Sequence, residues 1–301
     1  MIVNNILKIL SEAFFFLFRY SGITLLIRRT VARKNVTIIC YHNPNPVIFE
    51  KHMRYLSRRY SFIPLSILTN AIYTNDWHEI PLYPIVVTFD DGWKENAALL
   101  NIIVKHKICP TIYLTSHIIN TRKKFWWTIC KPEKREKLKK CINSDRLRIL
   151  FDEYSYFPEK EYEETRQALD LNEINNLKEY VEYGLHTSYH PVLIRCSIQE
   201  KIIEFSEGKS LLEKILEQSI DSFAYPNGDY DEEIIELLKN YGIRNARTID
   251  VGWNNRTTDP YKLKIVGVSD KGSINKFASE LTGISLYLQH LLRGSLIGKK
   301  K

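Results

Sequence analysis

Short apolar segments alternate with amphipathic segments along most of the chain. Strands are predicted at residues 36–41, 84–89, 109–115, 183–185, 222–225, 243–248 and 263–268. Helices are predicted at residues 48–60, 96–107, 171–182, 197–217 and 234–241. Strands that alternate with helices of about ten or more residues are typical of a parallel sheet or barrel. The pattern therefore predicts an α/β fold.

The N-terminal segment departs from this alternation. Residues 5–28 are rich in Leu, Ile and Phe but carry Lys8, Glu12 and Arg19, whereas a transmembrane span needs about 20 nearly uninterrupted apolar residues. We expect one or two helices that pack on the main domain. The alternative is a helix lying in the interface of a membrane.

A second departure is the charged and aromatic region at residues 121–170, which is expected to be an insertion over one rim. The predicted organisation has an N-terminal helical segment at 1–35 and a main domain at 36–270, followed by a C-terminal helix and basic tail at 271–301. At 301 residues, one α/β barrel accounts for the main domain.

Composition narrows the class of protein only slightly. The 43 Lys and Arg exceed the 35 Asp and Glu by 8, which favours an anionic membrane, an acidic glycan or nucleic acid without choosing among them. The basic stretch at 131–140 is interleaved with Glu133 and Glu136, so a solvated helix face is expected rather than a nucleic-acid site. Five widely spaced cysteines without a C-x-x-C pair favour a reducing, cytoplasmic location.

The first candidate chemistry is the Asp90-Asp91 pair at the end of the predicted strand 84–89. Neighbouring side chains of a strand point to opposite faces unless the backbone turns, and Gly92 permits a turn. A metal-dependent amide hydrolase needs one carboxylate on the metal and another that takes a proton from water. The alternative is a pair that caps the following helix.

His186 and His190 favour the catalytic interpretation. Two histidines four residues apart can bind one divalent ion, and Asp91 completes a set of two histidines and one carboxylate with positions left for water and substrate. Pro191 disfavours helical geometry at His190, so the pair is expected on a loop after a short strand. Together these residues predict a divalent metal site.

These segments carry a family resemblance. Thr88-Phe89-Asp90-Asp91-Gly92 and His186-Thr187-Ser188-Tyr189-His190 resemble the first two motifs of the polysaccharide deacetylase family, also called carbohydrate esterase family four. The resemblance runs from about residue 36 to about residue 269. It implies a distorted (β/α)7 barrel, with Asp90 as general base and Asp91, His186 and His190 as ligands of zinc or a similar ion.

Two more segments resemble motifs of the family. Phe223 to Gly228 resembles the third motif, which forms a groove wall at Tyr225 and Pro226 and supplies a backbone N–H to the oxyanion. Asp250-Val251-Gly252-Trp253 resembles the fourth motif and implies that Trp253 lines the acetyl pocket. For Phe125-Trp126-Trp127 we favour packing over stacking on sugar rings.

The chain lacks the arginine that many members carry near Ala224 to hold the catalytic base. Arg244, Arg247 and Lys264 are candidates for this role, which is otherwise lost.

A late histidine that serves many members as general acid is also missing from Leu263-Lys264-Ile265. His290 in the predicted C-terminal helix is a poor substitute. His42, at the end of the first predicted strand, is the better candidate, because the ends of barrel strands converge on the site. Similar Tyr-His pairs occur in the exopolysaccharide-type branch of the family, but a structural role for His42 stays open.

The resulting hypothesis is a metal-dependent hydrolase that removes N-acetyl groups from amino sugars of a cell-envelope polysaccharide or lipid-linked glycan. The expected partners are an N-acetylated glycan and, for a cytoplasmic protein, the membrane surface, but no nucleic acid. An O-acetyl esterase or another amide deacylase is the alternative on the same site. A non-catalytic glycan-binding protein on the same scaffold is the third reading, and the sequence leaves the sugar and the oligomeric state open.

Overall fold

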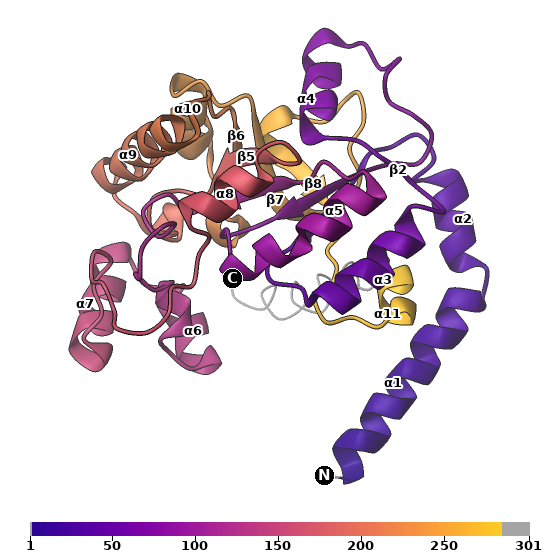
Figure 1. Ribbon diagram of the computed structural model, residues 1–301, viewed down its shortest axis with the longest axis horizontal. Helices are drawn as coiled ribbons and strands as arrows, with labels where there is room; N and C mark the ends of the chain where they lie inside the picture. Colours follow the sequence, from indigo (N-terminus) through magenta and orange to yellow (C-terminus); the bar gives the residue numbers. More distant parts are fainter. Residues whose placement is uncertain (1, 285–301) are drawn as a thin grey trace, which may run out of the picture.

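Parallel strands form the centre of the protein, which a computed structural model describes over residues 2–284 (Figure 1). The strands are β1 (Thr37–Tyr41), β2 (Ser61–Phe62), β3 (Pro84–Phe89), β4 (Thr111–Leu114), β5 (Glu182–Leu185), β6 (Ser222–Ala224), β7 (Asn245–Val251) and β8 (Leu263–Ile265). Their order is β1-β3-β4-β5-β6-β7-β8, with β2 beside β3, and all ladders between them are parallel. Strand β3 is buried along its whole length, as its apolar sequence predicts.

The sheet is nearly closed into a barrel. Beyond β8, the Val266 N–H donates to the Ile38 carbonyl of β1 at 2.8 Å, and Val36 forms a β-bridge with Asn254. The first and last strands of the sheet therefore lie next to each other. This confirms the predicted distorted (β/α)7 barrel.

Helices cover the outside of the sheet (Figure 1). They are α3 (Pro46–Leu56), α4 (Leu65–Thr74), α5 (Leu100–His106), α8 (Leu171–Leu177), α9 (Ile198–Leu216) and α10 (Glu232–Asn240). Polar residues define several helix starts: Asp170 and Ser197 form capping boxes, and Asn45 caps α3.

The predicted helix at 171–182 is too long, because α8 ends at Leu177 and Glu182 already belongs to β5. The Glu182 carboxylate accepts hydrogen bonds from the backbone N–H of Leu65 and from the Thr111 hydroxyl. These partners are distant in sequence, and hydrophobic periodicity cannot reveal them. Helix α4 and the two-residue strand β2 were not predicted.

The insertion contains α6 (Pro132–Leu138) and α7 (Asn143–Tyr154). It has a small hydrophobic cluster of its own, composed of Trp126, Cys130, Leu138, Leu150 and Tyr156. The Arg146 guanidinium lies 4.7 Å from the centre of the Trp126 ring, which adds a cation–π contact to this cluster.

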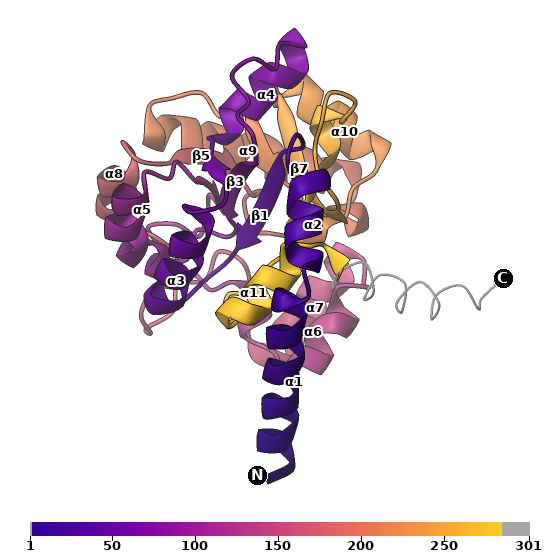
Figure 2. The same cartoon turned by 90° about the vertical axis from the view of Figure 1, so that its right-hand side faces the viewer.

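The N-terminal segment forms two helices, α1 (Ile2–Tyr20) and α2 (Ile23–Thr30). Arg19 near the end of α1 donates to Asn275 of α11 (Ile274–Glu280) at 2.9 Å. Figure 2 shows α1 leaving the body on the side toward which the β1 arrow points, where α6 and α7 also lie. The predicted tail from residue 285 onward, with His290, lies outside the described residues.

Within residues 2–284 no single helix is long and apolar enough to cross a membrane. Ile9–Tyr20 and Ile23–Thr30 meet the requirement as a pair, but the pair is bent by 50°.

Candidate active site

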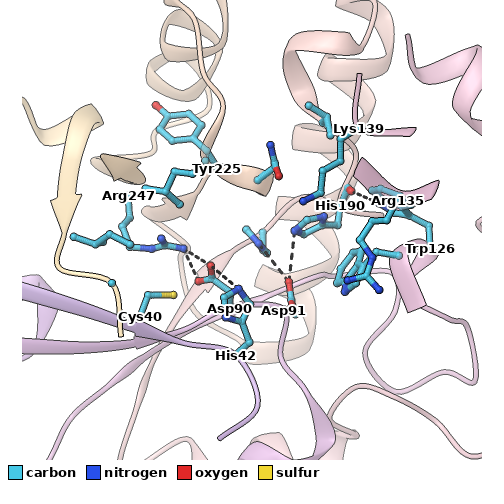
Figure 3. Close-up of a pocket in the computed structure, with 18 of the residues that line it drawn as sticks. Cys40, His42, Asp90, Asp91, Trp126, Arg135, Lys139, His190, Tyr225 and Arg247 are labelled. Atoms are coloured by element: carbon cyan, nitrogen blue, oxygen red, sulfur yellow. Dashed lines mark hydrogen bonds and ion pairs between the residues drawn. The ribbon is translucent and has the colours of Figure 1, made fainter. Parts of the chain in front are cut away.

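The Asp90-Asp91 pair stands at the C-terminal end of β3 and lines a cavity of about 420 Å³ (Figure 3). The backbone turns at Asp91 itself, whose φ is 72°, and continues through Gly92 with φ 75°. A Cβ atom at Gly92 would lie 2.6 Å from Leu114 Cδ2, so no larger residue fits there without a shift. This turn brings two consecutive carboxylates into one cavity, as the sequence predicts.

His186 and His190 lie on the loop after β5, and each Nε2 is 3.5 Å from Asp91 Oδ1. The His186 Nδ1 lies 2.8 Å from the Ala224 carbonyl oxygen. Because a carbonyl only accepts, Nδ1 carries the proton and the Nε2 lone pair faces Asp91. His190 has φ 56°, which confirms the non-helical geometry expected before Pro191.

The donor set of Asp91, His186 and His190 fits a divalent metal ion. Their ligand atoms all lie within 4.8 Å of one another. Burial lowers the pKa of both histidines, so each is neutral and offers a lone pair. Trp93 Nε1 donates to Asp91 Oδ2 at 2.8 Å, which leaves Oδ1 toward the imidazoles. Two nitrogens and one carboxylate oxygen are typical of catalytic zinc and related sites.

A second group with metal-ligand spacing consists of Cys40, His42 and Asp90. Burial raises the pKa of the Cys40 thiol well above its usual value, so it is not a thiolate. Both oxygens of Asp90 accept hydrogen bonds from Arg247. This group is therefore a poorer metal site than the first.

The partner of Asp90 is Arg247 of β7. Its Nη2 lies 2.5 Å from Asp90 Oδ1 and also contacts Oδ2, and its side chain is only 1% exposed. Burial raises the pKa of Asp90, but the Arg247 guanidinium, together with His186 and His42, outweighs this effect and holds the pKa well below its usual range. Among the three cations left open by the sequence, the structure therefore selects Arg247.

The register of the sheet explains this choice. Arg247 is the Cα partner of Ala224 in the β6–β7 ladder, so it stands beside the position near which many family members carry their arginine. Arg244 instead lies 3.6 Å from Asp221, and both side chains of that pair are exposed.

His42 follows β1 and also lines the cavity. Its Nε2 lies 4.0 Å from Asp90 Oδ2, and its side chain is 57% exposed. The backbone is held in place because the His42 N–H donates to the Asp270 carboxylate and the carbonyl accepts from Asn96. His42 thus lies beside Asp90 in the cavity, and Figure 3 marks the contact between the two side chains.

Of the residues expected at the substrate side, Tyr225 lines the cavity together with Asn227 and Gly228. The Tyr225 N–H donates to the Arg247 carbonyl, the Gly228 N–H donates to the Tyr225 carbonyl, and Pro226 has no N–H. An oxyanion donor from this segment would therefore come from Asn227 rather than from Tyr225 or Pro226.

Trp253 is not among the residues that line this cavity, so an acetyl pocket at that indole stays a prediction. Strand alternation carries Arg247 and Ile249 to the cavity. After the strand ends, Trp253 packs toward Gly283. The apolar part of the cavity wall is composed of Trp126, Trp127, Val192, Ile249, Ile265 and Val268.

The insertion closes one side of the cavity. Trp126 packs in the insertion cluster, as predicted, but its Nε1 also donates to the His190 carbonyl at 2.9 Å. The Trp127 ring centre lies 4.2 Å from that of His190. Arg135 and Lys139 line the cavity as well, so part of the basic stretch at 131–140 faces the site and is not simply a solvated face.

A buried carboxylate–arginine pair next to an Asp-His-His cluster, at the C-terminal mouth of a parallel barrel, is typical of hydrolases that act on acyl groups. The polysaccharide deacetylase family model matches residues 83–246, which is more than half of the chain. The chain therefore belongs to the polysaccharide deacetylase family, whose members are hydrolases acting on the amide bonds of acetylated sugars. No curated protein matches the chain in sequence.

Solved structures have the same fold. IcaB from Ammonifex degensii aligns with a TM-score of 0.61 at 16% identity, over 83% of this chain and 97% of that chain. The deacetylase PplD from Streptococcus pyogenes, in complex with acetate, aligns with a TM-score of 0.59 at 17% identity, over 80% and 95%. BC0361, a polysaccharide deacetylase from Bacillus cereus, aligns with a TM-score of 0.58 at 20% identity, over 83% and 69%.

Proposed function

We propose that the protein is a metal-dependent hydrolase that removes N-acetyl groups from amino sugars of a cell-envelope polysaccharide or a lipid-linked glycan. The observation that carries the proposal is that two adjacent carboxylates in one cavity have different partners. Asp91 stands with His186 and His190, whereas Asp90 is held by Arg247.

Each residue has a role in the proposed reaction. A divalent ion held by Asp91, His186 and His190 would supply Lewis acidity and lower the pKa of water. Asp90 takes a proton from water while the water oxygen bonds to the acetyl carbon. Arg247 keeps the Asp90 carboxylate ionised and in place.

In the later half of the proposed reaction, Asn227 and His42 act on the oxyanion and on the leaving nitrogen. In the proposed reaction the backbone N–H of Asn227, which lines the cavity together with Tyr225, donates to the oxyanion. His42, next to Asp90, protonates the nitrogen as the carbon–nitrogen bond breaks, so that acetate and a free amine leave.

Acetate release and metal content test these roles separately. In Asp90→Asn, acetate release should fall by about 10²-fold or more while bound metal stays at the wild-type level. Replacing His186 and His190 together with Ala should instead remove the metal. The exposed Asp152→Asn is the matched control. Full activity of Asp90→Asn would contradict the assignment of the base.

The same site would also cleave an ester. Paired N- and O-acetylated oligosaccharides, compared by acetate released under identical conditions, distinguish the N-deacetylase from an O-acetyl esterase. Binding of the glycan without release of acetate from either substrate, by metal-loaded protein, would favour the non-catalytic glycan-binding alternative.

We further propose that α1 lies on the surface of a membrane. The outward face of α1 is apolar: Leu10, Phe14 and Leu17 are each at least 60% exposed and recur at helical spacing. The polar residue Arg19 faces inward, toward Asn275. This is the reverse of the usual arrangement on a protein surface, and an apolar face of this kind suits a lipid interface.

Vesicle flotation tests the membrane proposal. The double substitution Phe14→Ser and Leu17→Ser should abolish flotation with vesicles containing phosphatidylglycerol, whereas Ile142→Ser with Phe151→Ser, at other exposed apolar sites, should not. Equal flotation of the two double variants would refute the proposal. Resistance to extraction at high pH would show a spanning segment instead.

A further inference from the structure

Two cations of the insertion line the cavity on the side of His190. Arg135 and Lys139 stand one helical turn apart at the end of α6, and both line the cavity that contains Asp90 and Asp91 (Figure 3). Residues at this spacing share one face of a helix. They come from a segment that contributes neither the candidate metal ligands nor the base.

These two cations differ from Arg247, whose charge is already matched by Asp90. Within residues 2–284, Arg135 forms no ion pair, and its Nε is buried without a hydrogen-bond partner. Among the described residues Lys139 pairs only with the neighbouring Glu136 at 2.9 Å, and the Glu136 side chain is 66% exposed. Ion pairs as exposed as this one contribute little.

A buried N–H without a hydrogen-bond partner is uncommon in proteins, because a missing hydrogen bond at a buried donor costs about 1–3 kcal/mol. Guanidinium donors are arranged in a planar fork that matches the oxygens of phosphate and carboxylate, and a neighbouring ammonium adds a point charge. The wall at Arg135 and Lys139 therefore has the donors and the charge that an oxyanion requires.

We propose that Arg135 and Lys139 form an anion-binding subsite that holds a phosphate or carboxylate group of the substrate glycan while its acetylated sugar lies at Asp90 and Asp91. This inference rests on the proposed function and adds a substrate class to it: anionic amino-sugar glycans are preferred to neutral ones. A neutral glycan offers no charge to match the Arg135 guanidinium and the Lys139 ammonium.

Paired substrates test this preference. Acetate release is measured from N-acetylglucosamine and N-acetylglucosamine 1-phosphate, and from neutral and uronate-containing disaccharides of N-acetylglucosamine. The variant is Arg135→Gln with Lys139→Gln. Lys137→Gln with Lys140→Gln is the control, because it removes the same charge from exposed positions of the same segment.

The double variant at 135 and 139 should raise KM for the anionic substrates on the order of tenfold to a hundredfold and leave the neutral substrates unchanged. The control should leave both unchanged. The phosphate and uronate arms show which oxyanion is preferred. Equal KM values of the wild type for neutral and anionic substrates, or the same loss in both double variants, would overturn the proposal.

Binding separates a failure of the subsite from a failure of the proposed function. Glucose 1-phosphate and glucose carry no acetyl group, so their affinities can be measured by calorimetry without turnover, with inorganic phosphate as a third probe. Tighter binding of glucose 1-phosphate that is lost only in the Arg135 and Lys139 variant supports the subsite even if no acetate is released from any substrate. Equal binding of both sugars refutes it.

Discussion

Replacing Arg247 with methionine tests the most buried charged contact of the site. The guanidinium contacts both oxygens of Asp90, and the side chains of Arg247 and Asp90 are 1% and 8% exposed. Methionine keeps much of the apolar volume but leaves the carboxylate buried without a partner. Breaking a buried pair in this way costs about 3–5 kcal/mol of unfolding free energy.

Urea unfolding at neutral pH measures this cost. Combining Arg247→Met with Asp90→Asn removes both charges, so the double variant should be more stable than Arg247→Met alone. Arg256→Met, at an exposed position, is the control and should change the unfolding free energy little.

The pH profile of activity distinguishes a role in the reaction from a purely structural one. Because Arg247 lowers the pKa of Asp90, its removal should raise that pKa, and the base should become protonated at higher pH. The acidic limb of kcat/KM should therefore move to higher pH in Arg247→Met. An acidic limb at the wild-type position, together with unchanged stability, would refute the reasoning.

Three further predictions concern residues around the site. Gly92→Ala places a Cβ 2.6 Å from Leu114 Cδ2 at positive φ and should lower the unfolding free energy by about 1–3 kcal/mol, so an unchanged Tm would contradict it. Burial raises the pKa of Glu204 to about 7, so its contribution to stability is full at pH below about 4 and is lost as the pH rises through 7. Urea titrations of Glu204→Gln should lack this pH dependence, and an identical dependence would count against it. Trp126→Phe removes the hydrogen bond to the His190 carbonyl and should weaken metal retention about tenfold in chelator competition, whereas wild-type retention would show that the bond does not position His190.

The barrel elements were predictable because their signals are local. Strand β3 is a continuous apolar run that ends at a turn residue, and α9 begins at a capping box, Ser197 with Glu200. The Asp-Asp and His-x-x-x-His segments were predictable for a related reason, since in a parallel barrel the ends of neighbouring strands converge. Signals of this kind require no knowledge of which distant segments meet.

The other parts of the site depend on tertiary placement. The β6–β7 register determines which cation contacts Asp90. This register cannot be predicted from the sequence pattern. Arg135 and Lys139 looked like ordinary surface charges because the path of the insertion over the rim was unknown. The Trp253 ring packs toward Gly283, a contact that the motif alone does not predict.

The Asp90–Arg247 pair shows why the proposed base, Asp90, has a cationic partner although the motif arginine is absent. A guanidinium can pair with a carboxylate from either of two adjacent strands, because paired residues on adjacent strands lie side by side at the same level of the barrel. Ala224 and Arg247 are such a pair, and the small Ala224 side chain leaves that level to Arg247. Cross-strand neighbours of a missing motif residue are therefore the first places to look for its replacement, before the loss of an arginine is taken as loss of catalysis.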